Sequence, residues 1–333
     1  MRKFIYIVSI LLLGQAVSAQ QLPIYSQYLY NKFLINPAHA GSDGFTSFNI
    51  TAREQWVGYT GAPRTYSLSW QTRILKGKYD IKSNIFKKNT YRPKNDGKVG
   101  LGAYVFSDKN GLVHRTGFQM TYSYHLWIHD NTQLSLGLAA NGYYFTIDVE
   151  QGSFVNQNEP LLNDNLRRGI FVPNVDFGVY ILNPSFDIGF SAQQLIGSSV
   201  IIGDLGGREY KMYRHYYGFG SYNINAGLKT VIQPSVLAKI SEQNLTPQAD
   251  IGLTYIYDQH LWAGMTYRSS GAIIANIMFR FMPVRLEKTS MYFGYAFDFT
   301  ANKIQSATFG THELTVAVKF GDSTRKYRWL DRF

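Results

Sequence analysis

The chain has 333 residues, a formal net charge of +11 and no cysteine. The lack of cysteine excludes disulfides, thiolate-bound metals and a lipid acceptor at a processed amino terminus. Aromatic residues make up 16% of the chain and charged residues 17%, a balance that favours a membrane β-barrel with aromatic girdles and a polar inner wall.

Residues 1–19 are predicted to be a cleaved secretory signal peptide. Arg2 and Lys3 provide its positive charge, Phe4 to Leu13 form an apolar run, and Val17 to Ala19 are small residues before a cut at Gln20. The apolar run is shorter than the roughly 20 residues that a membrane-spanning helix needs. Because the mature chain is exported, its positive charge does not indicate a nucleic-acid partner.

Residues 20–42 show no alternation and are predicted to be a non-strand amino-terminal segment. Ser26 to Ile35 are expected to form a short helix that ends before Pro37, since the residue before a proline disfavours the helical region. We expect this segment to fill the lumen of a barrel or to cover its periplasmic mouth.

Residues 43–320 alternate with a period of two and are predicted to form an outer-membrane barrel. Arg64 to Ile74 is a clear example, with Tyr66 and Leu68 on one face and Ser67 and Gln71 on the other. We predict an all-β, transmembrane, antiparallel up-and-down barrel of about 14 strands. Their centres lie near residues 49, 69, 103, 120, 139, 177, 190, 218, 235, 252, 264, 277, 295 and 315.

The links support an even strand count with both strand termini in the periplasm. Asn183 to Ser185 and Asp258-Gln259 are predicted to be tight periplasmic turns, whereas Ile147 to Gly169 and Gly197 to Met212 are predicted to be long extracellular links. The basic segment Leu75 to Gly97 falls on the periplasmic side. A solvated loop explains such a charge run, and a docking surface for a partner or lipid headgroups is the alternative.

A basic tail, residues 321–333, follows the last strand, which ends on Phe320. This tail is a second candidate for a periplasmic contact. A soluble periplasmic β-sandwich would also alternate, but its strands average about five or six residues, and the long aromatic faces in this chain favour the barrel.

No enzyme motif is present, and we predict that the protein is not an enzyme and needs no cofactor or metal. His125 and His129 bracket a predicted strand end, a poor arrangement for a metal site. Eight charged residues are predicted to face inward: Arg73, Lys239, Asp250, Arg268, Arg280, Asp298, Glu313 and Lys319. Because both signs are present, we interpret them as mutually paired, and a selective channel is the alternative.

Several short phrases occur in a characteristic order. They are Tyr25-Ser26-Gln27-Tyr28, Ile35-Asn36-Pro37-Ala38-His39-Ala40-Gly41, Arg53-Glu54-Gln55-Trp56-Val57-Gly58, Gly61-Ala62-Pro63-Arg64, Arg214-His215-Tyr216-Tyr217, Pro234-Ser235-Val236-Leu237, Leu261-Trp262-Ala263-Gly264, Tyr267-Arg268-Ser269 and Gly310-Thr311-His312-Glu313. In this order and behind a signal peptide, the set resembles the PorP/SprF family of outer-membrane proteins of the Bacteroidetes type IX secretion system.

The resemblance implies an outer-membrane component of, or accessory to, type IX secretion. It also implies three kinds of partner: outer-membrane lipid, secretion components, some of them tied to gliding motility, and a secreted or surface adhesin substrate. A porin-like channel for small solutes is the alternative function.

The residues of these phrases that are candidate partner contacts are Gln27, Tyr28, Asn36, Pro37, Gly41, Gln55, Trp56, Gly58, Pro63 and Arg64. We expect the first four on the inner side of the membrane and Trp56 and Gly58 on the outer side. For Trp56 an interfacial belt position is the alternative to a partner contact.

Overall fold

The computed structural model describes residues 25–74, 97–129, 131–148, 169–202, 208–243, 247–283, 289–301 and 307–321. Its elements are two 3₁₀ turns, η1 (Lys32–Leu34) and η2 (Pro37–His39), followed by strands. The strands are β1 (Thr46–Glu54), β2 (Arg64–Ile74), β3 (Val99–Asn110), β4 (Val113–His129), β5 (Thr132–Ile147), β6 (Ile170–Leu182), β7 (Phe186–Gln193), β8 (Ser199–Ile202), β9 (Arg208–Lys211), β10 (His215–Tyr222), β11 (Ile224–Asn225), β12 (Thr230–Ser241), β13 (Gln248–Tyr257), β14 (Leu261–Arg268), β15 (Ala272–Phe281), β16 (Thr289–Thr300) and β17 (Thr311–Phe320).

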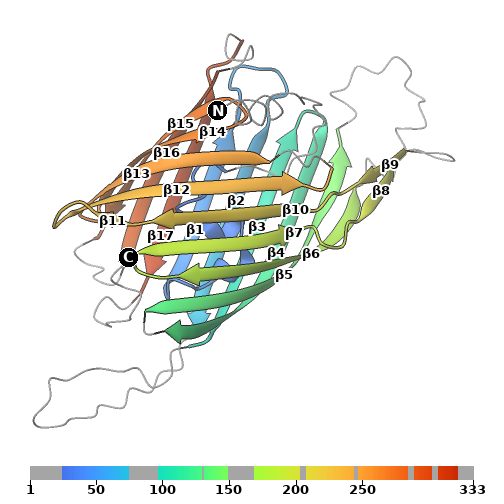
Figure 1. Ribbon diagram of the computed structural model, residues 1–333. Helices are drawn as coiled ribbons and strands as arrows, with labels where there is room; N and C mark the ends of the chain where they lie inside the picture. The colour runs from blue at the N-terminus through green and yellow to red at the C-terminus, as the bar shows by residue number, and fades with distance from the viewer. Residues whose placement is uncertain are drawn as a thin grey trace, which may run out of the picture.

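The strands close into a single antiparallel barrel (Figure 1). β11 continues β10 after Asn223, and β8 and β9 form a separate hairpin, so the wall has fourteen crossings, as the sequence predicted. Neighbouring crossings follow one another along the chain, and the sheet closes where β1 pairs with β17 in the register Thr46↔Phe320 to Glu54↔His312. Closure leaves no unpaired sheet edge around the wall.

The alternation of the sequence places polar residues inside and apolar residues outside. In β2, Ser67, Ser69, Gln71 and Arg73 are buried in the lumen, while Leu68 points outward and is exposed. Exposed outward residues of other strands are also large and apolar, including Val105, Met120, Leu138, Ile188, Phe190, Ile251, Met265, Phe279, Phe293 and Leu314. An apolar outer surface of this extent needs lipid rather than water around it.

The two ends of the barrel carry different links. At the inner end, where β1 begins and β17 ends, residues 183–185 and 258–260 form the tight turns that the sequence predicted. The outer end carries the other set of links, including the one between β7 and β10. That link contains the β8–β9 hairpin, whose two strands the sequence analysis did not anticipate. Residues 1–24, the basic segment 75–96 and the tail residues 322–333 lie outside the described residues.

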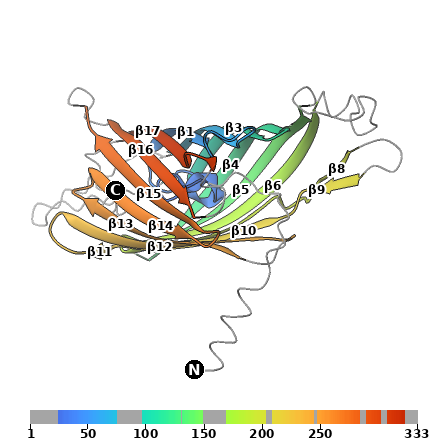
Figure 2. The ribbon, with the colours of Figure 1, turned by 90° about the horizontal axis from the view of Figure 1, so that it is seen from above.

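The amino-terminal segment lies inside the barrel, where Figure 2 shows it in blue within the ring of strands. The predicted helix over Ser26 to Ile35 is wrong: this stretch consists of turns and the three-residue η1. The segment closes short turns instead, in which the Tyr30 N–H donates to the Gln27 carbonyl and the Leu34 N–H to the Asn31 carbonyl. Its two ends bond to the wall through the Ser26 N–H, which donates to Glu313, and the Ile35 carbonyl, which accepts from Ser191.

A charge on the outward face is expected to destabilise the barrel. Leu68→Arg, near the middle of β2, should lower the free energy of unfolding by about 2–4 kcal/mol, because the outward face lies in hydrocarbon. Leu228→Arg is the matched control, since Leu228 is fully exposed on the link between β11 and β12. Denaturant titrations of both variants in lipid vesicles measure the difference, and equal losses would contradict a lipid-facing Leu68.

Candidate functional site

Residues 25–43, which we call the plug, cross the lumen and are largely buried. Tyr28, Phe33, Asn36 and Ala38 are each no more than 2% exposed. Partners of the plug come from β1, β2, β4, β5, β6, β7, β15, β16 and β17, which include opposite sides of the barrel. The plug is therefore fixed to the wall by polar contacts along its whole length.

Glycines in three strands let the plug approach the wall closely. A methyl group on Gly102 would lie 2.5 Å from the Phe33 ring, and one on Gly137 would overlap the backbone of Pro37 and Ala38. Gly100 and Gly178 are similarly covered, by the Ala40 carbonyl and the Asn36 side chain. The period-two glycines of β3 are thus explained by close packing in the lumen.

The amino-terminal end of the plug is bound by a charge cluster near the outer end. Arg53 of β1 donates to Glu313 of β17 at 2.9 Å and to Asp298 of β16 at 2.8 Å. The plug completes this cluster, because the Ser26 and Gln27 N–H groups donate to the two Glu313 carboxylate oxygens at 2.7 and 2.9 Å. We call Arg53, Asp298, Glu313 and Ser26 the tether cluster.

The tether cluster continues into neighbouring strands. Arg268 of β14 pairs with Asp250 of β13 at 2.9 Å and lies 3.7 Å from Asp298. At the inner end of β17, away from the tether cluster, Lys319 pairs with Asp43 of the plug at 3.0 Å. These contacts match the interpretation that inward charges pair with one another. Lys239 differs, because within the described part of the chain its ammonium group has no hydrogen-bond partner, and it lies 5.7 Å from the centre of the Tyr217 ring.

The middle of the plug is held by a second ion pair. Lys32 of η1 donates to both carboxylate oxygens of Asp187 in β7 at 2.8 Å. Asp187 also accepts from Ser221, so three elements meet at this carboxylate. The side chain of Asn36 caps η2 by accepting from the Ala38 N–H, and its amide donates to the Val179 carbonyl. The sequence analysis did not single out Lys32 or Asp187. The available signals were the family phrases on either side of Lys32 and the alternation in β7 that turns Asp187 inward.

The carboxyl-terminal part of the plug lies at the inner end. Ser123 and His125 of β4 both contact the Ala40 carbonyl, at 2.6 and 3.0 Å. Burial lowers the pKa of His39 to about 4, so its ring is neutral at pH 7. His125 has a structural role, since its two ring nitrogens contact the Ala40 carbonyl and the Ser135 hydroxyl. Among the described residues, no cluster of three or more acidic or histidine side chains could hold a metal.

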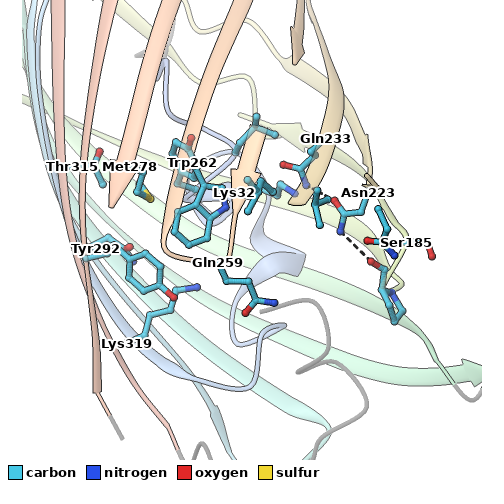
Figure 3. A pocket seen from close by; sticks show the side chains of 18 residues that line it. Lys32, Ser185, Asn223, Gln233, Gln259, Trp262, Met278, Tyr292, Thr315 and Lys319 are labelled. Atoms are coloured by element: carbon cyan, nitrogen blue, oxygen red, sulfur yellow. Dashed lines mark hydrogen bonds between the residues drawn. The ribbon is translucent and has the colours of Figure 1, made fainter. Parts of the chain in front are cut away.

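A cavity of about 350 Å³, which we call the vestibule, lies between the plug and the wall (Figure 3). Inner-end turns supply Ser185, Asn223 and Gln259, and the plug supplies Tyr30 and Lys32. The other lining residues are Leu29, Asn49, Pro184, Asn225, Val231, Gln233, Ile256, Trp262, Met278, Tyr292, Thr315, Ala317 and Lys319. The volume falls within the range of small-ligand sites, roughly 300–1,000 Å³.

The ten candidate contact residues divide into two groups in space. Five are buried in the plug, inside the lumen: Gln27, Tyr28, Asn36, Pro37 and Gly41. The other five belong to the β1–β2 link and its junction with β2 at the outer end: Gln55, Trp56, Gly58, Pro63 and Arg64. The first group is placed to hold the plug, while the second group is at least partly accessible except for Pro63.

The second group lies beside the link that precedes β17. The Val57 N–H donates to the Gly310 carbonyl and the Phe309 N–H donates to the Val57 carbonyl, at 2.9 and 2.8 Å. These bonds extend the β1–β17 seam beyond the strands. Gly58 has a φ of +95°, and a methyl group there would lie 3.0 Å from the Phe309 ring. Trp56 is half-buried at this rim.

A family model described as "Type IX secretion system membrane protein PorP/SprF" matches residues 17–318. No curated protein matches the chain. Among solved structures it is similar to the Ralstonia pickettii toluene transporter TbuX, with 11% identity, 91% of this chain and 95% of that chain covered, and a TM-score of 0.48. The Acinetobacter baumannii outer membrane protein Omp33 has 9% identity, 84% and 100% coverage and a TM-score of 0.38. The Pseudomonas putida toluene transporter TodX has 10% identity, with 87% of this chain and 93% of that chain covered, and a TM-score of 0.43.

A closed fourteen-stranded wall with an apolar outer face and a polar, filled lumen defines an outer-membrane β-barrel. The chain belongs to the PorP/SprF family of type IX secretion membrane proteins. Bacterial barrels with an even number of crossings keep their short turns in the periplasm, so the inner end and the vestibule face the periplasm. Among the described residues, no helix is long and apolar enough to cross a membrane.

Breaking the tether cluster is expected to destabilise the barrel strongly. Arg53→Leu removes the cation that pairs with Glu313 and leaves Asp298 with Arg268 as its cation, at 3.7 Å, which should cost about 3–5 kcal/mol of unfolding free energy. Arg64→Leu is the control, because the Arg64–Glu54 pair is 3.8 Å long and exposed and should contribute less than about 1 kcal/mol. Guanidinium titrations of both variants in lipid vesicles test this, and similar losses would argue against a central role for Arg53.

Filling the glycine contact should displace the plug. Gly137→Ala places a methyl group against Pro37 and Ala38, whereas Gly218→Ala meets nothing within 4 Å and is the matched control. The chain has no cysteine, so Ser42→Cys provides one reporter thiol at a fully buried position whose hydroxyl has no hydrogen-bond partner among the residues that the structure describes. A water-soluble maleimide should label this thiol in the Gly137→Ala background and not in the Gly218→Ala background.

Proposed function

We propose that this barrel assists the secretion or surface attachment of particular type IX substrates, such as adhesins, and does not itself conduct them. Membership of the PorP/SprF family is the observation that carries the proposal. The polar contacts of the plug with β17 on one side and with β7 on the other support it. A polypeptide cannot share a lumen that is already crossed by a fixed segment, so the exported chain requires another conduit.

The outer surface offers a place for such an accessory role. The joined links around Trp56 and Phe309 form a defined rim at the outer end, and Phe309 is 76% exposed. At the inner end the vestibule and the turns around it are open to the periplasm. A barrel with accessible features at both ends and a filled centre suits docking to secretion components better than it suits transport.

The alternative, a channel for small solutes, rested on the charged lumen. Arg53, Arg268 and Lys319 each have carboxylate partners, and the plug supplies one of those carboxylates, Asp43. Paired charges do not form the open ring that gives a pore its selectivity. Conduction therefore requires movement of the plug.

Deleting the gene is expected to remove one or a few proteins from the cell surface or the medium. Quantitative proteomics of both fractions measures this, and expression of the wild-type chain should restore them. Trp56→Ala and Gln27→Ala are expressed separately in the deletion strain. The variant that fails to restore the missing proteins shows whether secretion depends on the outer rim or on the plug. An unchanged secreted proteome, together with steady open-pore currents of the wild-type protein in planar bilayers, would instead favour the channel.

A further inference from the structure

The vestibule has two unlike walls. Figure 3 shows Trp262 and Tyr292 on one side and Gln233, Asn223 and Ser185 on the other. The first wall comes from β14 and β16, and the second from β12 and the turns at the start of β7 and after β10. A ligand between them would meet aromatic rings on one face and polar groups on its opposite edge.

The aromatic wall is held in place by its neighbours. The Trp262 and Tyr292 rings have centroids 5.9 Å apart and are tilted by 52°. The Lys319 ammonium lies 5.4 Å from the centre of the Tyr292 ring, and the Arg280 guanidinium lies 5.7 Å from it. Rings that are fixed in this way can pack against the C–H face of a ligand with little loss of side-chain entropy.

The opposite wall combines fixed and free amides. Gln233 donates to Asn223 at 2.8 Å, and Asn223 donates to the Pro184 carbonyl at 3.0 Å, so these two side chains are oriented. Asn225 and Gln259 are exposed and make no side-chain hydrogen bond within the described part of the chain. Each offers both a donor and an acceptor to a ligand.

The charges of the vestibule favour a neutral or acidic ligand over a cationic one. Among the described residues no carboxylate lines the cavity, whereas Lys32 and Lys319 do. Their partners, Asp187 and Asp43, lie behind them with side chains no more than 1% exposed. The ligand that fits these walls is therefore neutral or acidic, with hydroxyl or amide groups on its edge and an apolar face.

An extended peptide fits the vestibule less well than a sugar does. Around the cavity the backbones of β12 to β17 and β1 are paired on both edges, so they offer few main-chain partners. Within the described residues, the two-residue β11 pairs only with β12, and its other edge is too short for strand addition. Side chains must supply the recognition, as they do for hydroxyl-rich rings.

We propose that the vestibule is a saccharide-binding site that faces the periplasm and takes one or two neutral or acidic sugar rings. Trp262 and Tyr292 pack against the ring face, and Asn225 and Gln259 bond its hydroxyl or acetamido groups. Lys319 favours an acidic substituent near Tyr292. The site does not depend on the secretion role, since its walls and volume are properties of the barrel alone.

The test is calorimetric titration of the purified full-length protein with N,N′,N″-triacetylchitotriose, maltotriose and an uncharged Gly-Ser-Asn decapeptide. The protein is kept in lipid nanodiscs or in lauryldimethylamine oxide, because a sugar-headed detergent would compete for the site. We expect saturable binding of at least one of the two sugars and no binding of the decapeptide.

Trp262→Leu should weaken that binding roughly tenfold, which corresponds to about 1.4 kcal/mol, because it removes the ring that packs against the sugar. Trp70→Leu is the matched control on the outward face of β2 and should leave it unchanged. Gln259→Gly, which suits the φ of +53° at that position, should weaken it several-fold without risk to folding. Failure of both sugars to bind, equal binding by Trp262→Leu, or binding of the decapeptide alone would overturn the proposal.

Discussion

The pairing of Arg53 with two carboxylates is the interaction on which the rest of the barrel depends. Arg53 and Glu313 are direct register partners across the β1–β17 seam, where the sheet closes. Asp298 lies one strand further on and shares the same guanidinium. Two buried carboxylates this close need a cation and further donors, and the plug provides the donors through Ser26 and Gln27. Closure of the wall and docking of the plug therefore stabilise each other.

The shape of the lumen follows from that coupling. Glycines of β3, β5 and β6 leave room for the turns of the plug, so one side of the lumen is packed like a protein core. The space that the plug leaves beside β12 to β17 is the vestibule, which opens at the inner end. A filled bore with a polar and aromatic vestibule is unlike a pore lined by unpaired charges. It agrees with the accessory role proposed above.

Much of the fold could be predicted because its signals are local. The period of two decides which side chains face lipid, and the tight turns at 183–185 and 258–260 fix the parity of the strands. The candidate site was predicted less fully. Inward charges such as Asp298 and Glu313 were identified from the alternation, but their partners depend on register and closure. The short helix expected from Ser26 was wrong, because the segment folds into short turns that are docked against the wall at Glu313 and Ser191.

The sequence by itself determined that disulfides are absent, that about fourteen alternating strands cross the membrane, and that the lumen is polar. It also supplied the family phrases that contain the two groups of candidate residues. Only the tertiary structure decided that Gln27 and Asn36 are buried in the plug, that Lys32 pairs with Asp187, and that a vestibule exists. The reason is separation along the chain. The tether cluster joins residues up to 287 positions apart, and no local pattern specifies which groups a closed barrel brings together.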